Sequence, residues 1–122
     1  MDLAGMIGLS DVLRETRLVL RPRRPRLART LEPLGGEPWW GSGRIVTEIP
    51  GSTLPRAVVF RDSFASRVAP FLSEHFSRVV YLWQDNFDVD AVLAERPALV
   101  IQEIAGRHLL SVSPYSNAPA SK

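Results

Sequence analysis

The chain has 122 residues, 45% hydrophobic and 23% charged, which is the composition of one globular domain with room for a hydrophobic core. It has no cysteine, which excludes disulfides, thiolate metal sites and a cysteine nucleophile, and its two histidines are too few for an all-histidine zinc site. The formal charge is +2. No apolar run approaches roughly 18 residues, so we expect no membrane span. We also expect neither a metal nor a cofactor.

The first part of the chain, residues 1–56, has little hydrophobic periodicity, and we predict a loop-rich segment with short strands. Residues 2–9 are apolar with two glycines, which is typical of a packed turn or a short helix. Residues 10–15 begin with good capping residues and predict a brief helix. Residues 18–20 predict a short strand, and residues 44–49, where apolar side chains alternate, predict a half-buried one.

Residues 22–43 are rich in proline and glycine and predict a loop. Trp39 and Trp40 lie in it, and such a pair either stacks on a sugar ring or closes the edge of the core. Five arginines crowd into residues 21–29, where two prolines oppose a helix. Because no aromatic residue is interleaved and no recognition helix follows, we expect a solvated extended segment or a contact with parts of a longer protein, and no nucleic-acid site.

We expect the rest of the domain to be arranged around the stretch at residues 57–67, in the middle of the chain. Residues 57–60 form an apolar run that is too short for a helix and suits a buried strand. Asp62 and Ser63 then favour the start of a helix, and apolar side chains recur every four residues after them. We therefore predict a strand, a sharp turn and a helix over residues 63–76, bent or restarted at Pro70.

A regular alternation of strands and helices follows. Residues 79–83 predict a second buried strand, Asp88 caps a short helix that ends before Pro97, and residues 98–104 predict a third strand. Residues 57–113 therefore predict a β-α-β-α-β unit of an α/β domain, with right-handed crossovers and a parallel sheet.

Polar side chains collect where the three predicted strands end, and the carboxyl ends of parallel strands share the edge at which ligands bind. These positions are Arg61, Asp62 and Ser63, then Gln84, Asp85 and Asn86, then Gln102, Glu103, Arg107 and His108. A serine at a helix start has N–H donors beside it that can hold an oxyanion, so Ser63 can serve as a nucleophile. The alternative is that Asp62 and Ser63 only cap the helix.

A nucleophilic serine needs a base, and the two histidines are the candidates. His75 lies late in the predicted helix, about 18 Å from Ser63 at 1.5 Å per residue, which is out of reach. His108 follows the third strand and can approach the same edge, either as the base or as a surface or packing residue. Its nearest acidic neighbour in the sequence is Glu103.

Four segments carry a resemblance to a known family: Asp2–Leu9, Val58–Phe64, Pro70–Val79, and Arg96–Glu103 with Arg107. They resemble the SGNH-hydrolase-like domain of the alginate O-acetyltransferases (AlgX/AlgJ-like). The resemblance runs from residue 2 to about residue 110. It implies a three-layer SGNH/flavodoxin-like parallel sheet, of which this chain holds the carboxyl-terminal portion. The implied division is a partial domain over residues 1–113 and a disordered tail over residues 114–122.

The resemblance also implies roles for individual residues. Ser63 matches the family nucleophile, with Asp62 and Arg61 supporting the turn that holds the oxyanion. The candidate substrate-binding residues are Trp39, Trp40, Trp83, Asn86 and Arg107. The implied substrate is an acyl ester of a polysaccharide, and the implied compartment is the periplasm or another exported location.

The family's Asp-x-His motif, which supplies the base and its orienting carboxylate, does not occur in these 122 residues. We therefore expect the chain to be inactive alone and to need an amino-terminal part of a longer protein as its partner. A second hypothesis remains open, in which the chain is a non-catalytic α/β module that binds a glycan or a protein and Ser63 only caps a helix.

Overall fold

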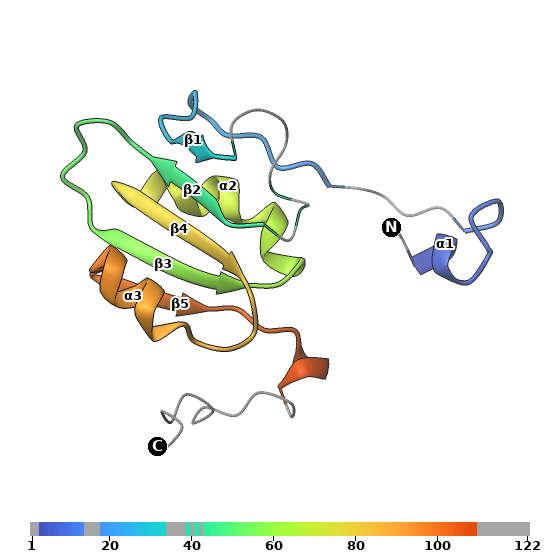
Figure 1. Cartoon of the computed structure of the whole chain (residues 1–122). Coiled ribbons are helices and arrows are strands. Elements are labelled where there is room, and N and C mark those ends of the chain that lie inside the picture. The colour runs from blue at the N-terminus through green and yellow to red at the C-terminus, as the bar shows by residue number, and fades with distance from the viewer. Residues whose placement is uncertain (1–2, 14–17, 34–38, 40, 42, 110–122) are drawn as a thin grey trace, which may run out of the picture.

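Residues 3–13, 18–33, 39, 41 and 43–109 are described in the computed structural model (Figure 1). The expectations that fall outside them are those on Trp40, on the side chain of Arg107, on the end of the helix predicted at residues 10–15 and on the tail at residues 114–122.

The secondary structure is short and concentrated in the second half of the chain. In chain order the elements are α1 (Leu3–Met6), β1 (Arg29–Glu32), β2 (Ile45–Glu48), β3 (Arg56–Arg61), η2 (Phe64–Arg67), α2 (Ala69–Leu72), η3 (Ser73–His75), β4 (Arg78–Trp83), α3 (Val89–Glu95), β5 (Leu99–Gln102) and η4 (Gly106–His108), where η marks a 3-10 helix. The predicted strand, helix and strand order after residue 57 is confirmed.

The first half of the chain departs from prediction in three places. Residues 18–20 form no strand, and their side chains are exposed because no described strand pairs with them. Residues 10–13 form a turn in place of the predicted helix. β1 lies within the predicted loop, and all four of its residues are exposed, so no alternation of apolar side chains could reveal it.

The single helix predicted over residues 63–76 is divided into η2, α2 and η3. Pro70 stands in the first turn of α2 and has no N–H to continue the hydrogen-bond series from η2. The chain therefore restarts there, which is one of the two outcomes predicted for this proline.

The strands form one five-stranded sheet in the order β1-β2-β4-β3-β5 (Figure 1). β3 pairs in parallel with β4 on one side and with β5 on the other, as predicted. β1 and β2 add to the free side of β4 in antiparallel fashion, so the sheet is mixed and not parallel throughout.

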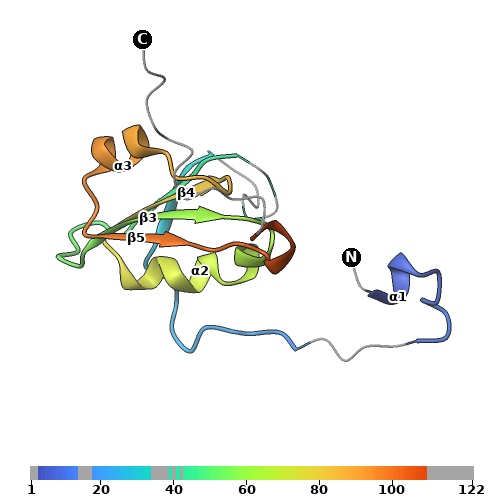
Figure 2. The ribbon, with the colours of Figure 1, turned by 90° about the horizontal axis from the view of Figure 1, so that it is seen from below.

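The sheet is covered on both faces, which confirms a three-layer α/β fold. Figure 2 shows α2 below the sheet and α3 above it. This follows from the strand order, because the crossover from β3 to β4 runs one way across the sheet and the crossover from β4 to β5 runs back past β3. Right-handed crossovers of opposite direction put their helices on opposite faces, and ligands bind where the direction reverses, at the carboxyl ends of β3 and β5.

The core lies on both faces of the three central strands. On the α2 side the buried residues are Ile45, Ala57, Val59, Ala69, Phe76, Val79 and Tyr81. On the α3 side they are Val46, Val58, Phe60 and Val80. α3 itself has no buried residue, and β5 is half exposed at the edge of the sheet, so the α3 side is the thinner layer.

The arginine-rich segment is extended, as predicted, and residues 21–27 are exposed. It nevertheless contacts the helical layer, because the Glu74 carboxylate accepts hydrogen bonds from the backbone N–H groups of Leu27 and Ala28 at 3.0 and 3.1 Å. Arg26 also lies 5.0 Å from the ring centre of Phe71. Of the helices in the described part of the chain, none is long and apolar enough to cross a membrane.

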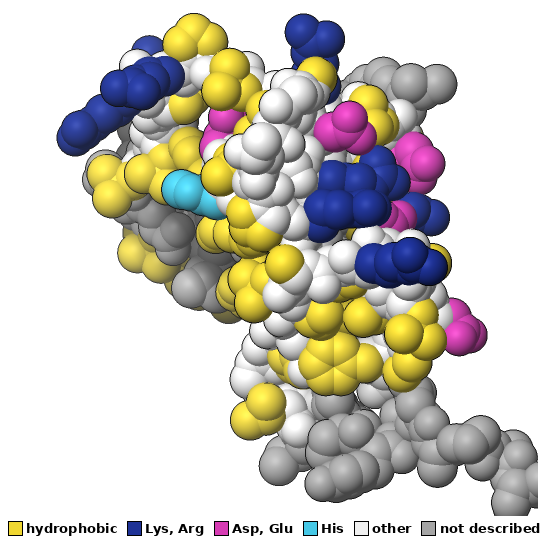
Figure 3. All heavy atoms as spheres, turned by 90° about the vertical axis from the view of Figure 1, so that its left-hand side faces the viewer, with side chains coloured by type: hydrophobic (Ala, Val, Ile, Leu, Met, Phe, Trp, Pro, Cys, Tyr) yellow, Lys and Arg dark blue, Asp and Glu magenta, His cyan; other side chains and the backbone are white. Residues whose placement is uncertain are grey.

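Ion pairs lie at the amino ends of β3 and β4, the end of the sheet that faces the viewer in Figure 3. The Glu95 carboxylate, at the end of α3, lies 2.9 Å from Arg44, 2.7 Å from Arg56 and 3.0 Å from Arg78. Hydrogen bonds from Arg78 are the main reason that the pKa of Glu95 is lowered. This end of the sheet is therefore tied together by charge, away from the strand ends that carry Ser63.

Candidate active site

The turn after β3 is capped by Asp62 and not by Ser63. The Asp62 Oδ1 atom accepts a hydrogen bond from the N–H of Phe64 at 2.7 Å. Ser63 occupies the position before η2 with helical dihedral angles (φ −67°, ψ −23°), and its side chain makes no capping hydrogen bond. The capping interpretation of this turn therefore holds for Asp62 and is wrong for the serine.

Asp62 also ties the turn to the end of β5. It is 5% exposed, and its Oδ2 atom accepts a hydrogen bond from the N–H of Ala105 at 2.8 Å. Its own N–H donates to the Glu103 carboxylate at 2.9 Å. Burial raises the pKa of Glu103, and the neighbouring Asp62 charge raises it further. Two carboxyl groups thus fix the backbone on either side of the serine.

Ser63 is left with unused polar groups at this edge. Its side chain is exposed, and its carbonyl accepts the N–H of Ser66 at 3.3 Å. Within the described residues, neither the hydroxyl nor the backbone N–H of Ser63 has a hydrogen-bond partner. The fold therefore holds the backbone around the serine and leaves its hydroxyl and N–H available to a ligand.

Arg61, expected to support the turn, is fully buried. Its Nη1 donates to the carbonyl of Trp39 at 3.2 Å and to the Ser66 hydroxyl at 3.0 Å, and its Nη2 donates to the carbonyl of Gly41 at 3.0 Å. The guanidinium carbon lies 4.7 Å from the ring centre of Trp83. Burial lowers the pKa of Arg61.

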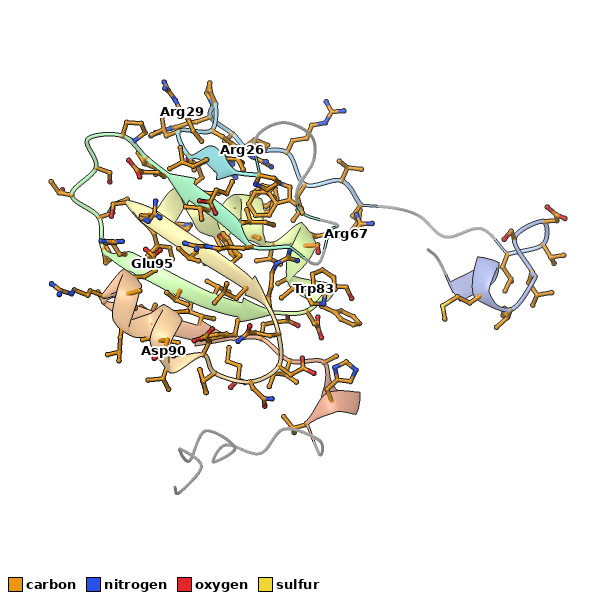
Figure 4. All side chains as sticks on the ribbon, viewed as in Figure 1. Arg26, Arg29, Arg67, Trp83, Asp90 and Glu95 are labelled. Atoms are coloured by element: carbon orange, nitrogen blue, oxygen red, sulfur yellow. The ribbon has the colours of Figure 1, made fainter. Side chains whose placement is uncertain are left out.

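The other candidate substrate-binding residues differ in their surroundings. Trp39 packs against the core and meets Tyr81 edge to face at 5.5 Å between ring centres, so its ring closes the core edge. Trp83 is partly exposed at the carboxyl end of β4, where Figure 4 shows it near the edge that also carries Arg67. Asn86 is exposed in the loop that follows. Arg107 lies in η4.

His108 pairs with a carboxylate that the sequence reasoning did not connect to it. Its Nδ1 lies 3.2 Å from Oδ2 of Asp85, in the loop after β4. The backbone of that loop is held in turn, since the Asp85 carbonyl accepts a hydrogen bond from the Gln102 side chain at 2.6 Å. Since the Ser63 hydroxyl has no partner among the described residues, His108 is not hydrogen-bonded to it.

The signal for this pair was present in the sequence. Asp85 and His108 follow different strands whose carboxyl ends share one edge, and that rule alone places the two loops together. His75, in η3, belongs to the helical layer below the sheet. Among the residues that the structure describes, no group of three or more histidine, aspartate or glutamate side chains is arranged to hold a metal ion.

Comparisons with known proteins add little to this geometry. No protein-family model and no curated protein matches the chain. Among solved structures, the chain is similar to PatB1 of Bacillus cereus, with 23% sequence identity and a TM-score of 0.42. The match covers 48% of this chain and 21% of the PatB1 chain, so the chain spans about a fifth of that structure. A likeness at this score carries no argument about function.

Proposed function

We propose that this chain carries the nucleophile of a serine-dependent acyl-transfer site, in an O-acetyltransferase or acetylesterase-like domain that acts on acetyl esters of a polysaccharide. One observation carries the proposal: Ser63 is exposed at the carboxyl end of β3 and its hydroxyl makes no hydrogen bond to the residues that the structure describes, while Asp62 takes the capping role. A serine that only stabilised the turn would be expected to make that bond itself.

In the proposed reaction the Ser63 oxygen attacks the carbonyl carbon of an acetyl ester, and the carbonyl oxygen becomes an oxyanion. The free N–H of Ser63 is one donor for that oxyanion. Collapse of the intermediate breaks the ester bond, releases the donor alcohol and leaves an acetyl group on Ser63. A sugar hydroxyl or water then takes the acetyl group and restores the serine.

The proton of the Ser63 hydroxyl must pass to a base, and the described residues offer none within hydrogen-bonding distance. His108 and Asp85 have the pairing of a base and its orienting carboxylate, but neither is hydrogen-bonded to Ser63. We therefore assign the base to residues outside this chain, in keeping with the resemblance to a family whose Asp-x-His motif is absent here.

The experiment compares two proteins with p-nitrophenyl acetate as acyl donor: this chain alone, and the same chain together with the residues that its gene encodes ahead of Met1. The longer protein is expected to transfer acetyl groups to an oligomannuronate or a cello-oligosaccharide acceptor. Ser63→Ala is expected to abolish that transfer, and the matched control Ser10→Ala, an exposed serine in the turn that follows α1, is expected to leave it unchanged. Mass spectrometry is expected to find the acetyl group on Ser63.

The chain alone is expected to hydrolyse the ester no faster than its Ser63→Ala variant. Serine-dependent turnover by the chain alone would show that its base lies within these residues, with His108 the first residue to substitute. If the longer protein shows no Ser63-dependent transfer, the catalytic proposal is wrong. Retained oligosaccharide binding in that case would favour the non-catalytic glycan-binding module.

A further inference from the structure

The most unusual side chain near Ser63 is Arg61, a fully buried arginine at the end of a core strand. Arginine is almost never fully buried unless its donors are satisfied, because removal of the charge from water is costly. Here Nη1 and Nη2 are satisfied by hydrogen-bond acceptors on segments that β3 does not pair with. Within the described residues, Nε is the guanidinium nitrogen that has no partner.

The acceptors come from different parts of the chain and converge on this one group. Two are the carbonyls of Trp39 and Gly41, which precede β2, and a third is the hydroxyl of Ser66, in η2. The fourth is the carbonyl of the adjacent Asp62, at 3.4 Å. The planar guanidinium also stacks against the ring of Trp83, at the end of β4. A guanidinium presents its donors in a fixed plane, so one side chain can hold several acceptors and a ring in a single arrangement.

Trp39 and Gly41 belong to none of the described strands, so a sheet ladder does not satisfy their carbonyl groups. Arg61 satisfies these two carbonyls. An ammonium group could not do the same, because lysine offers a compact charge without the planar fork and without a flat surface for the Trp83 ring.

We propose that Arg61 is a positioning residue, which fixes η2 at Ser66, the backbone at Trp39 and Gly41, and the ring of Trp83 at the carboxyl edge of the sheet, so that Trp83 can stack on a sugar ring of a carbohydrate acceptor. The sugar part of this inference rests on the proposed function. The positioning part rests on the contacts of Arg61 alone. Stacking of a sugar on an aromatic ring needs a ring held in one orientation, and Arg61 supplies that restraint from one face.

The test of positioning uses hydrogen exchange in the chain carrying Arg61→Lys. Ser66 is buried, its N–H donates to the Ser63 carbonyl and its hydroxyl accepts from Arg61. We expect amide exchange at Ser66 to become at least tenfold faster, with exchange at Val79 and Val80 in the core unchanged. The matched control Arg96→Lys, an exposed arginine at the end of α3, is expected to change neither. In Arg61→Ala, added ethylguanidinium is expected to restore slow exchange at Ser66. Wild-type exchange in Arg61→Lys, or a failure of rescue in a folded Arg61→Ala protein, would overturn the positioning role.

The test of the carbohydrate role measures tryptophan fluorescence during titration with cello-oligosaccharide and oligomannuronate. We expect at least tenfold weaker binding in Arg61→Lys and in Trp83→Leu, and no change in Arg96→Lys. Binding that is absent in the wild type, or equal in wild type and Arg61→Lys, would overturn the carbohydrate role. Neither measurement needs acyl transfer, so both can succeed even if Ser63 is not a nucleophile. Conversely, a negative result for Arg61 would not contradict the proposed role of Ser63.

Discussion

The clearest test of the turn after β3 compares two adjacent residues, Asp62 and Ser63. If Asp62 is the structural residue and Ser63 is free, Asp62→Ala removes the acceptors of the Phe64 and Ala105 N–H groups, whereas Ser63→Ala removes no bond within the described residues. Asp62→Asn is the graded variant, because an amide keeps one oxygen and can serve only one of the two N–H groups.

The magnitudes follow from the contacts. The bond to Phe64 is a cap at an exposed residue and is worth about 1 kcal/mol, and the bond from Ala105 to a buried carboxylate is worth about 1.5 to 3 kcal/mol. Removal of Asp62 also relieves repulsion on Glu103, which offsets part of the loss. We therefore expect Asp62→Ala to lower the free energy of unfolding by about 2 to 3 kcal/mol, out of a total of about 5 to 15.

Urea unfolding followed by circular dichroism measures these free-energy differences. In thermal unfolding, the Tm of Asp62→Ala is expected to fall by roughly 10 °C. Asp62→Asn is expected to lose about half as much free energy, and Ser63→Ala to stay within about 0.5 kcal/mol of the wild type. A Ser63→Ala protein destabilised by more than about 1 kcal/mol, beside a nearly unchanged Asp62→Ala protein, would refute the argument that the fold leaves the serine free.

Two carboxyl groups at opposite ends of the sheet are expected to respond to pH in opposite ways. The pKa of Glu95 is lowered by its hydrogen bonds from Arg78, so its contribution to stability is present above about pH 4.3 and is lost as the pH falls through the lowered value. Urea unfolding should find Glu95→Gln about 1 to 3 kcal/mol less stable at pH 7 and equal to the wild type near pH 2; an equal difference at both pH values would exclude the ion pairs as its cause. The pKa of Glu103 is raised by burial, so the folded state holds its proton more tightly than the unfolded state, and stability falls as the pH rises through the raised value. The same assay should find that the stability of Glu103→Gln relative to the wild type rises between pH 4 and pH 7, and a fall over that range would contradict the sign.

The second half of the fold could be predicted because its sequence repeats a simple pattern. The apolar runs at residues 57–60 and 79–83 are buried on both faces and separated by a helical stretch, which leaves few alternatives to a parallel pair. β1 could not be predicted, because its side chains are exposed and its place depends on backbone pairing with β2. The leucines at 18 and 20 led to the opposite error, a predicted strand that the structure does not have. Apolar residues form a strand only where a neighbouring strand pairs with them.

The candidate site shows the same division between local and distant signals. The exposed serine after a buried strand is a local pattern, and the structure has it at the expected edge. The separation of roles between Asp62 and Ser63 is not local, because Asp62 is committed by its bond to Ala105 after β5. Arg61 is the extreme case. In the sequence it is a charged residue at the end of a strand, and its burial depends on acceptors at Trp39, Gly41 and Ser66 that the sequence does not bring together.

The division of roles between Ser63 and its neighbours determines what Ser63 can do. A turn can present a reactive hydroxyl at a fixed place only if other groups hold its backbone, since a hydroxyl engaged in holding the turn is not available to attack an ester. Here Asp62 and Glu103 hold the backbone on both sides of Ser63, and Arg61 holds η2 through Ser66. The restraint that a nucleophile requires is therefore provided by residues other than the nucleophile, and that is the arrangement expected when the serine has a function beyond the fold.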